Sequence, residues 1–184
     1  MPDTFHMLFP SPFGKIGLVW VESGKTPRIC RVILSSEKRS AENFLGGDFP
    51  LSRPGVSAQM ETLAARMGNF LRGEDVTFEM DSLLLDRCSR FQQQVLQIEH
   101  GVPRGRVTSY QRIAEKSGSP RSARPVGSAL ARNPFPILVP CHRAIRSDGT
   151  LGGFQGGLAM KRALLALEGI EFTSRGKVVS PSFF

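Results

Sequence analysis

Three prolines, Pro134, Pro136 and Pro140, constrain this chain more than any other feature, because they lie close together in an otherwise apolar segment. The residue before a proline is biased away from the helical region, so we expect residues 134–140 to be extended. The segment leads directly into a Cys-His-Arg sequence at positions 141–143. We therefore expect the cysteine to follow a buried, non-helical stretch.

The first half of the chain has an α/β pattern. Residues 16–21 and 29–34 are short β-branched runs that predict strands, and residues 76–78 are a third strand candidate. Apolar side chains recur at helical spacing over residues 57–71, which predicts a helix. We assign residues 1–85 to an N-terminal α/β domain, a small sheet plus a helix, with a supporting role.

The second half, residues 86–184, predicts a mostly α C-terminal domain. Helices are expected over 91–100 and over about 158–168. Between them, Thr108 and Gln111 match a capping box that would open a short helix, and Ser122 can cap another.

Gly118 separates these two short helices, as in a helix-turn-helix of the winged-helix-like kind. Helical pairs with such turns are also common in purely structural roles. The pattern alone therefore leaves DNA binding open.

The charge is unevenly distributed. Residues 1–85 carry nine basic and ten acidic side chains, whereas residues 86–184 carry fifteen and six. Nine of the basic residues lie between Arg104 and Arg146, against one acid, Glu115. This density favours a phosphate-facing surface, with nucleic acid slightly ahead of an anionic membrane or an acidic protein.

No apolar run approaches the ~18 residues of a membrane span, and the N-terminus lacks a basic start followed by an apolar stretch. We therefore expect an intracellular protein with no membrane partner. The three cysteines, Cys30, Cys88 and Cys141, have no C-x-x-C spacing and predict free thiols. No zinc-ligand spacing is recognisable, so no metal site is predicted.

Cys141 is the candidate nucleophile, because His142, Arg143 and Arg146 lie beside it in the sequence and positive charge favours a thiolate. A cysteine after an apolar run is also commonly an inert core residue. Two further charges, Arg124 and Glu168, would each oppose the dipole of a predicted helix. Such conflicts mark functional positions, or else both side chains are exposed and screened.

Residues 89–169 resemble the O6-alkylguanine-DNA alkyltransferase (methylated-DNA–protein-cysteine methyltransferase) family. The order and spacing of five motifs carry the resemblance: Gly105-Arg-Val-Thr-Ser-Tyr110, Ser122-Ala-Arg-Pro-Val-Gly127, Asn133-Pro134, Val139-Pro-Cys-His-Arg143 and Leu164-Leu-Ala-Leu-Glu168-Gly169. The first half matches only loosely, through Ser11-Pro-Phe-Gly14 and Phe70-Leu-Arg-Gly73.

This resemblance implies single-turnover DNA repair without a cofactor. A monomer would bind double-stranded DNA from the minor-groove side, flip out the O6-alkylguanine and transfer the alkyl group irreversibly to its own cysteine. The implied catalytic residues are Cys141, His142, Glu168 and Asn133. The implied DNA contacts are Arg124, Tyr110, Gln111, Ser119 and Ser147. The implied substrate pocket consists of Tyr110, Val139, Phe154 and Gln155.

Phe154 departs from the family pattern, in which many relatives have a tyrosine near these glycines, so the aromatic wall is kept and its hydroxyl is lost. Two other classes of function stay open. One is a non-catalytic reader of alkylated bases, against which the presence of Cys141, His142 and Glu168 together argues. The other is a helix-turn-helix transcriptional regulator that senses alkylation or oxidation through Cys141.

Overall fold

The computed structural model describes residues 3–24, 26–179 and 184, and the chain divides into two compact units. The N-terminal unit consists of residues 1–84 together with 134–136, and the C-terminal unit consists of residues 85–133 and 137–184. Within the described residues, no helix has the length and apolar character needed to cross a membrane.

The N-terminal unit is built on a four-stranded sheet with strand order β3-β2-β1-β4. Its strands are β1 (Thr4–Phe9), β2 (Ile16–Ser23), β3 (Thr26–Leu34) and β4 (Arg53–Pro54). Strand β2 pairs antiparallel with both β1 and β3, while β4 runs parallel to β1. The predicted hairpin is therefore present, and β1 extends the sheet on its other side.

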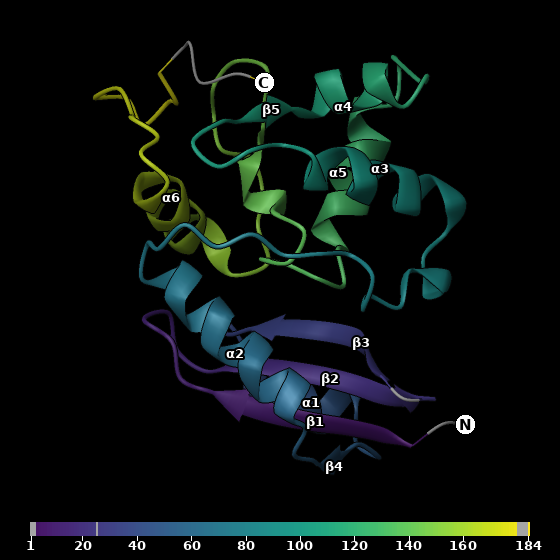
Figure 1. Ribbon diagram of the computed structural model, residues 1–184. Helices are drawn as coiled ribbons and strands as arrows, with labels where there is room; N and C mark the ends of the chain where they lie inside the picture. Colours follow the sequence, from purple (N-terminus) through teal and green to yellow (C-terminus); the bar gives the residue numbers. More distant parts are fainter. Residues whose placement is uncertain (1–2, 25, 180–183) are drawn as a thin grey trace. The chain divides into compact units, whose positions relative to one another are not determined.

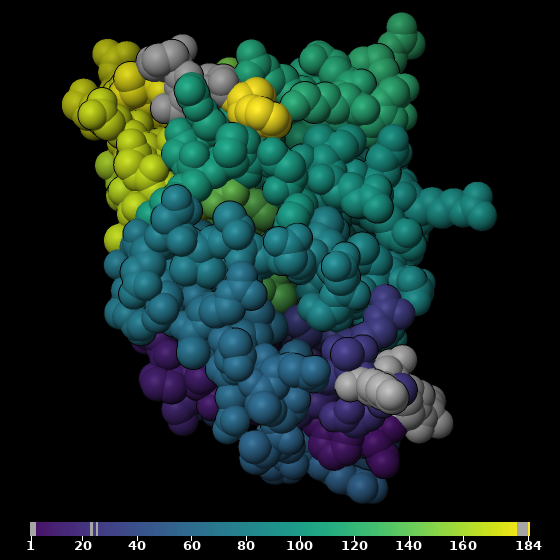
Figure 2. Space-filling view, viewed as in Figure 1, coloured from purple at the N-terminus to yellow at the C-terminus, as the bar shows by residue number. Residues whose placement is uncertain are grey.

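Both faces of this sheet are buried. Val19 and Ile33 pack with α1 (Ala41–Asp48) through Leu45. Side chains alternate between faces along a strand, and Trp20, next to Val19, is also buried. Figure 1 shows α2 (Ala58–Leu71) lying lengthwise across the sheet, and Figure 2 shows blue side chains of the segment that contains α2 hiding much of the purple sheet.

The strand predicted over residues 76–78 is wrong, because these residues belong to no strand. Phe78 is buried instead by side chains of α2. Its ring makes an edge contact with Phe70 at a centroid distance of 5.8 Å, and the Arg66 guanidinium lies over it at 5.5 Å. An aromatic residue that packs on a helix gives the same apolar signal as a short strand.

The C-terminal unit is mostly helical, as predicted. Its elements are η1 (Leu85–Arg87), α3 (Arg90–His100), β5 (Thr108–Ser109), α4 (Tyr110–Lys116), α5 (Ala123–Ala131), η2 (Cys141–Arg143), β6 (Ala144–Ile145) and α6 (Gly157–Leu167). The two short strands pair in parallel, and α4 packs against α5. These contacts bring the turn that begins at residue 141 next to the start of α4.

The predicted capping box is displaced by one residue. Ser109, rather than Thr108, caps α4, and its hydroxyl accepts a hydrogen bond from the Arg112 N–H. Thr108 pairs with Ala144 in the small sheet. Gln111 does not return to the cap, since its side-chain amide donates to Glu115 and to the Pro120 carbonyl.

The segment 134–140 is not extended throughout. Its beginning belongs to the N-terminal unit, where the Pro134 carbonyl accepts a hydrogen bond from Val32 N–H of β3. The chain then turns at Ile137, which has a φ of 75°. Proline restricts the residues that precede it, but Ile137 follows a proline and precedes none until Pro140, so the constraint did not reach it.

Candidate active site

Cys141 begins the η2 turn, and its surroundings hold it in place. The side chain is buried, and its backbone N–H donates to the Val139 carbonyl over 2.8 Å. The buried Asn133 amide donates to the same carbonyl over 3.1 Å, and Asn133 also makes a hydrogen bond with the thiol that lowers the pKa of Cys141. Asn133, just beyond α5, thus connects that helix to the cysteine turn.

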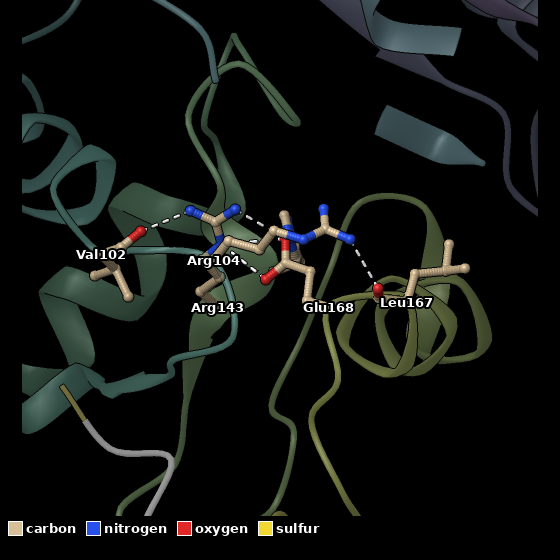
Figure 3. A network of polar contacts seen from close by, with 6 residues as sticks. Val102, Arg104, Arg143, Leu167 and Glu168 are labelled. Atoms are coloured by element: carbon tan, nitrogen blue, oxygen red, sulfur yellow. Dashed lines mark hydrogen bonds and ion pairs between the residues drawn. The ribbon is translucent and has the colours of Figure 1, made fainter. Parts of the chain in front are cut away.

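The next two residues of the turn converge on Glu168, which ends α6. His142 Nε2 lies 2.9 Å from Glu168 Oε1, and the Arg143 guanidinium donates to both Glu168 oxygens over 2.8–3.2 Å. Figure 3 shows the Arg143 guanidinium between the Glu168 carboxylate and the Val102 carbonyl, to which it donates over 2.6 Å. The same view shows Arg104 capping the Leu167 carbonyl of α6.

These contacts fix the protonation of the histidine. Burial raises the pKa of Glu168, but its hydrogen bonds and attraction to His142 and Arg143 outweigh burial and bring it to about 2, so the group is a carboxylate. Burial lowers the pKa of His142 despite the opposing effect of Glu168, so the imidazole is neutral before reaction. A neutral ring that donates from Nε2 to a carboxylate presents Nδ1 as its proton-accepting nitrogen.

The expectation that neighbouring positive charge would favour the Cys141 thiolate is wrong. Burial raises the pKa of Cys141 to about 11. Arg143 does not offset this, because its guanidinium is bound to Glu168 and Val102. The resting nucleophile is therefore a thiol, and its reaction requires a base that removes the proton during attack.

A cavity of about 380 Å³ lies against Cys141 in the C-terminal unit. Its lining combines the start of α4, most of α5 and the glycine-rich loop before α6. The lining residues are Tyr110, Arg124, Gly127, Ser128, Leu130, Ala131, Cys141, Arg146, Gly152, Gly153 and Phe154. A concave site with one buried thiol, apolar walls and cations at its margin suits a flat, anionically tethered ligand.

Close packing of Gly152 and Tyr110 forms one wall of this cavity. A Cβ placed on Gly152 would lie 2.5 Å from the Tyr110 hydroxyl oxygen, and Gly152 has a φ of +67°. Both facts require glycine at this position. Burial raises the pKa of Tyr110 to about 12, with nearby Glu99 and Cys141 adding to the rise, so its hydroxyl keeps its proton and remains a hydrogen-bond donor.

The other residues predicted for the substrate pocket occupy different positions. Phe154 lines the cavity, and its ring makes an edge contact with that of His142 at a centroid distance of 6.3 Å. Val139 is buried and Gln155 donates to the Asn133 carbonyl over 2.6 Å, but neither is among the lining residues. These two side chains buttress the site through Asn133.

The residues predicted to contact DNA lie outside the cysteine turn. Arg124 is exposed on the first turn of α5, so for Arg124 the alternative of an exposed, screened charge holds at the level of position. Glu168 is buried and paired, so for Glu168 that alternative is wrong. Gln111 is engaged within its own turn, Ser119 is half-buried in the α4–α5 turn, and Ser147 is exposed.

Sequence reasoning missed several contributors to the site. Arg143 was expected only to add positive charge, whereas it is a structural partner of Glu168. Arg146 lines the cavity, and Glu99 and Lys161 are fully buried in the same unit. A glutamate and a lysine at apolar positions of two helical repeats were the available signal.

All three cysteines are free thiols, as predicted, and Cys141 is the one that lies on the cavity.

Comparison with known proteins assigns this architecture to one family. Residues 90–170 match the model of the 6-O-methylguanine DNA methyltransferase DNA-binding domain. The methylated-DNA–protein-cysteine methyltransferase of Methanothermobacter thermautotrophicus is 38% identical over 160 residues, covering 86% of this chain and 82% of the relative. The rat protein of the same name is 37% identical over 183 residues, covering 90% and 82%.

Solved structures agree with the sequence relatives. The Mycobacterium tuberculosis O6-methylguanine methyltransferase superimposes with a TM-score of 0.70 at 30% identity, covering 90% of this chain and 92% of the other. A structure of the M. tuberculosis OGT protein in complex with DNA gives the same TM-score and identity, over 89% and 92% of the two chains. The chain belongs to the methylated-DNA–protein-cysteine methyltransferase family.

Proposed function

We propose that this protein repairs O6-alkylguanine in duplex DNA by transferring the alkyl group to Cys141, once per molecule. The observation that carries the proposal is a buried thiol on the wall of a cavity, followed in the chain by a histidine that a buried carboxylate orients. Family membership supports the same chemistry.

DNA binding is assigned to the basic C-terminal unit. Helices α4 and α5 act as a helix-turn-helix, with Arg124 at the cavity margin on the first turn of α5. We infer that the unit approaches from the minor-groove side and that Arg124 occupies the gap left by the flipped nucleotide. Filling that gap offsets an extrusion cost of a few kcal/mol.

Further contacts hold the DNA backbone around the extruded nucleotide. Tyr110 is placed to crowd the phosphate of the target nucleotide, while Gln111, Ser119 and Ser147 contact neighbouring phosphates. These residues lie on α4, in the turn after it and in the loop after β6. Contacts of this kind carry no sequence information, as a repair protein that acts at any lesion requires.

The transfer is an in-line displacement. His142 Nδ1 takes the thiol proton, through a water molecule, and Glu168 stabilises the imidazolium that forms. The sulfur electron pair forms a bond to the alkyl carbon while the carbon–O6 bond breaks, and its electrons pass to the guanine. The Tyr110 hydroxyl, held protonated by burial, donates to the leaving base. The product is a thioether, which explains a single turnover.

The protein acts as a monomer in this proposal, because one chain supplies every group named. Residues 86–184 form the DNA-binding and alkyl-acceptor domain, and residues 1–85 form its supporting domain. The setting of this chemistry is the DNA of the cell.

The proposal is tested by intact-protein mass after incubation with a duplex that contains one O6-methylguanine. We expect a gain of one methylene unit, saturating at one per molecule, in the wild type and in a Cys30→Ala control, and none in Cys141→Ala. Retained lesion binding without a mass gain in the wild type would instead identify a non-catalytic reader of alkylated bases. Strong preference for one DNA sequence over random duplexes would favour a regulator.

A further inference from the structure

Glu99 of α3 and Lys161 of α6 are both fully buried in the C-terminal unit, and the mechanism above uses neither. Withdrawing an ion from water is costly unless a partner compensates it. The other buried carboxylate of this unit, Glu168, is already bound by His142 and Arg143. Glu99 is therefore the acid available to balance Lys161.

Lys161 joins two backbone segments that flank the reactive sulfur. Its ammonium donates to the Ala144 carbonyl over 2.5 Å and to the Gly153 carbonyl over 3.3 Å. Ala144 follows the Cys-His-Arg turn directly, and Gly153 lines the cavity. One buried cation thus ties α6 to the cysteine segment and to the opposite cavity wall.

Glu99 meets the same segment from α3. Both of its carboxyl oxygens are buried, and neither completes a regular hydrogen bond within the part of the chain that the structure describes. The Ala144 backbone amide is close enough to lower the pKa of Glu99. Ala144 therefore lies between the two groups, with its carbonyl on Lys161 and its amide near Glu99.

The charges of this pair act on Cys141. The ionisable groups in electrostatic range of Glu99 are Lys161, Arg143, Tyr110 and Cys141, and Arg146 also acts on Lys161. A charged Lys161 lowers the pKa of the Cys141 thiol, and an ionised Glu99 raises it. The two members of the pair thus have opposite effects on thiolate formation.

Burial keeps the pair net positive at neutral pH. It raises the pKa of Glu99 to about 8, against the attraction of Lys161 and Arg143, so the acid is mostly protonated. It lowers the pKa of Lys161 to about 8, against the attraction of Cys141 and Glu99. Because the groups interact, their protons leave in steps that belong to the pair, and the net positive charge is lost in mildly alkaline solution.

We propose that Glu99 and Lys161 are positioning residues for alkyl transfer: Lys161 fixes the segments on both sides of the sulfur and stabilises the developing thiolate, and Glu99 weakens that stabilisation when it ionises. This inference rests on the proposed function of Cys141. It adds a proton-sharing pair to the histidine and glutamate that already serve the thiol.

The test is the rate at which free O6-benzylguanine alkylates Cys141, followed by intact mass from about pH 6 to about pH 10. Glu99→Gln should match the wild type below about pH 7 and exceed it at least about threefold near pH 9.5, as half a unit of altered thiol pKa would produce. Lys161→Met should react at least about threefold more slowly near pH 7. Glu171→Gln, an exposed acid of the same unit, should match the wild type throughout.

A stability measurement accompanies the rates and covers a Lys161→Met variant that fails to fold. The pKa of Glu99 is raised on folding from 4.5 to about 8, so the folded wild type loses stability as the pH rises through that interval. The melting temperature of Glu99→Gln should therefore rise relative to that of the wild type between these pH values, and a purely packing role would give a constant difference.

Parallel rate profiles for Glu99→Gln and the wild type, with a constant melting difference, would overturn the inference while leaving Cys141 as the acceptor. A wild type that is not alkylated at Cys141 at any pH would overturn both the inference and the proposed function. The two failures are therefore distinguishable.

Discussion

The two units of this protein bury very different side chains. Among the described residues, those buried in the N-terminal unit are apolar, such as Leu18, Trp20 and Ile29. The buried polar and charged residues all belong to the C-terminal unit: Glu99, Thr108, Ser109, Ser117, Asn133, His142, Arg143, Lys161 and Glu168. Buried polar groups cost stability unless they are paired, so their concentration in one unit indicates where structure serves chemistry.

The largest effect is expected from Glu168→Gln. This change removes the carboxylate that His142 and Arg143 share and leaves the Arg143 guanidinium buried without its counter-charge. We expect a transfer rate at least about a hundredfold lower, typical of a disabled general base, and a loss of about 3–5 kcal/mol in unfolding free energy.

Single-turnover transfer from lesion duplex and urea unfolding measure the two effects of Glu168→Gln. Glu171→Gln, an exposed acid in the same unit, is the matched control. Wild-type rate and stability in Glu168→Gln would remove the reason for its buried network.

Arg124→Ala separates the handling of DNA from the chemistry. Since Arg124 is exposed at the cavity margin, its loss should leave the buried network intact. We expect transfer from duplex DNA to fall about 10- to 100-fold, the equivalent of a few kcal/mol of extrusion cost, while transfer from free O6-benzylguanine is preserved. Comparing the two substrates under the same conditions decides the point, and equal losses would count against the gap-filling role.

Gly152→Ala should narrow the cavity without touching any charge. The new methyl group would meet the Tyr110 hydroxyl oxygen at 2.5 Å, on a backbone with φ +67°. We expect transfer of a benzyl group to fall about tenfold, and that of a methyl group to fall less, because misplacement of the reacting atoms is expensive. The two rates are measured with lesion duplexes. Ala at Gly153, where a Cβ meets nothing within 4 Å, is the control.

The smallest effect on chemistry is expected from the N-terminal unit. Leu18→Ala opens a cavity in an apolar core and should cost about 2–5 kcal/mol of unfolding free energy. At a temperature where the variant is folded, its transfer rate should stay within about twofold of the wild type. A much larger loss of rate in a folded Leu18→Ala protein would show that this unit does more than support the site.

Most helices were predictable from the sequence because each has an apolar stripe and a stop signal, as α2 and α3 do. The cysteine turn was predictable for a different reason, since Cys141-His142-Arg143 is contiguous. Strand β1 lacks a long β-branched run and depends on pairing with β2, so local pattern did not indicate it.

The electrostatics of the site were not predictable locally. Arg143 reads as a cation beside the cysteine, but its partner Glu168 lies 25 residues away, and only the fold brings them together. Lys161 reads as one of several basic residues on an amphipathic helix, although it is completely buried. Burial decides the pKa of Cys141, and burial is a property of packing that adjacent residues do not reveal.

The position of the transferred group tests the central claim most directly. A duplex that carries an O6-methylguanine labelled with ¹³C in the methyl group is incubated with the wild type, and the label is located by peptide mass mapping. The account predicts one labelled methyl thioether per molecule, on the peptide that contains Cys141. Label on the peptide of Cys30 or Cys88, or on no peptide while the lesion disappears from the DNA, would contradict it.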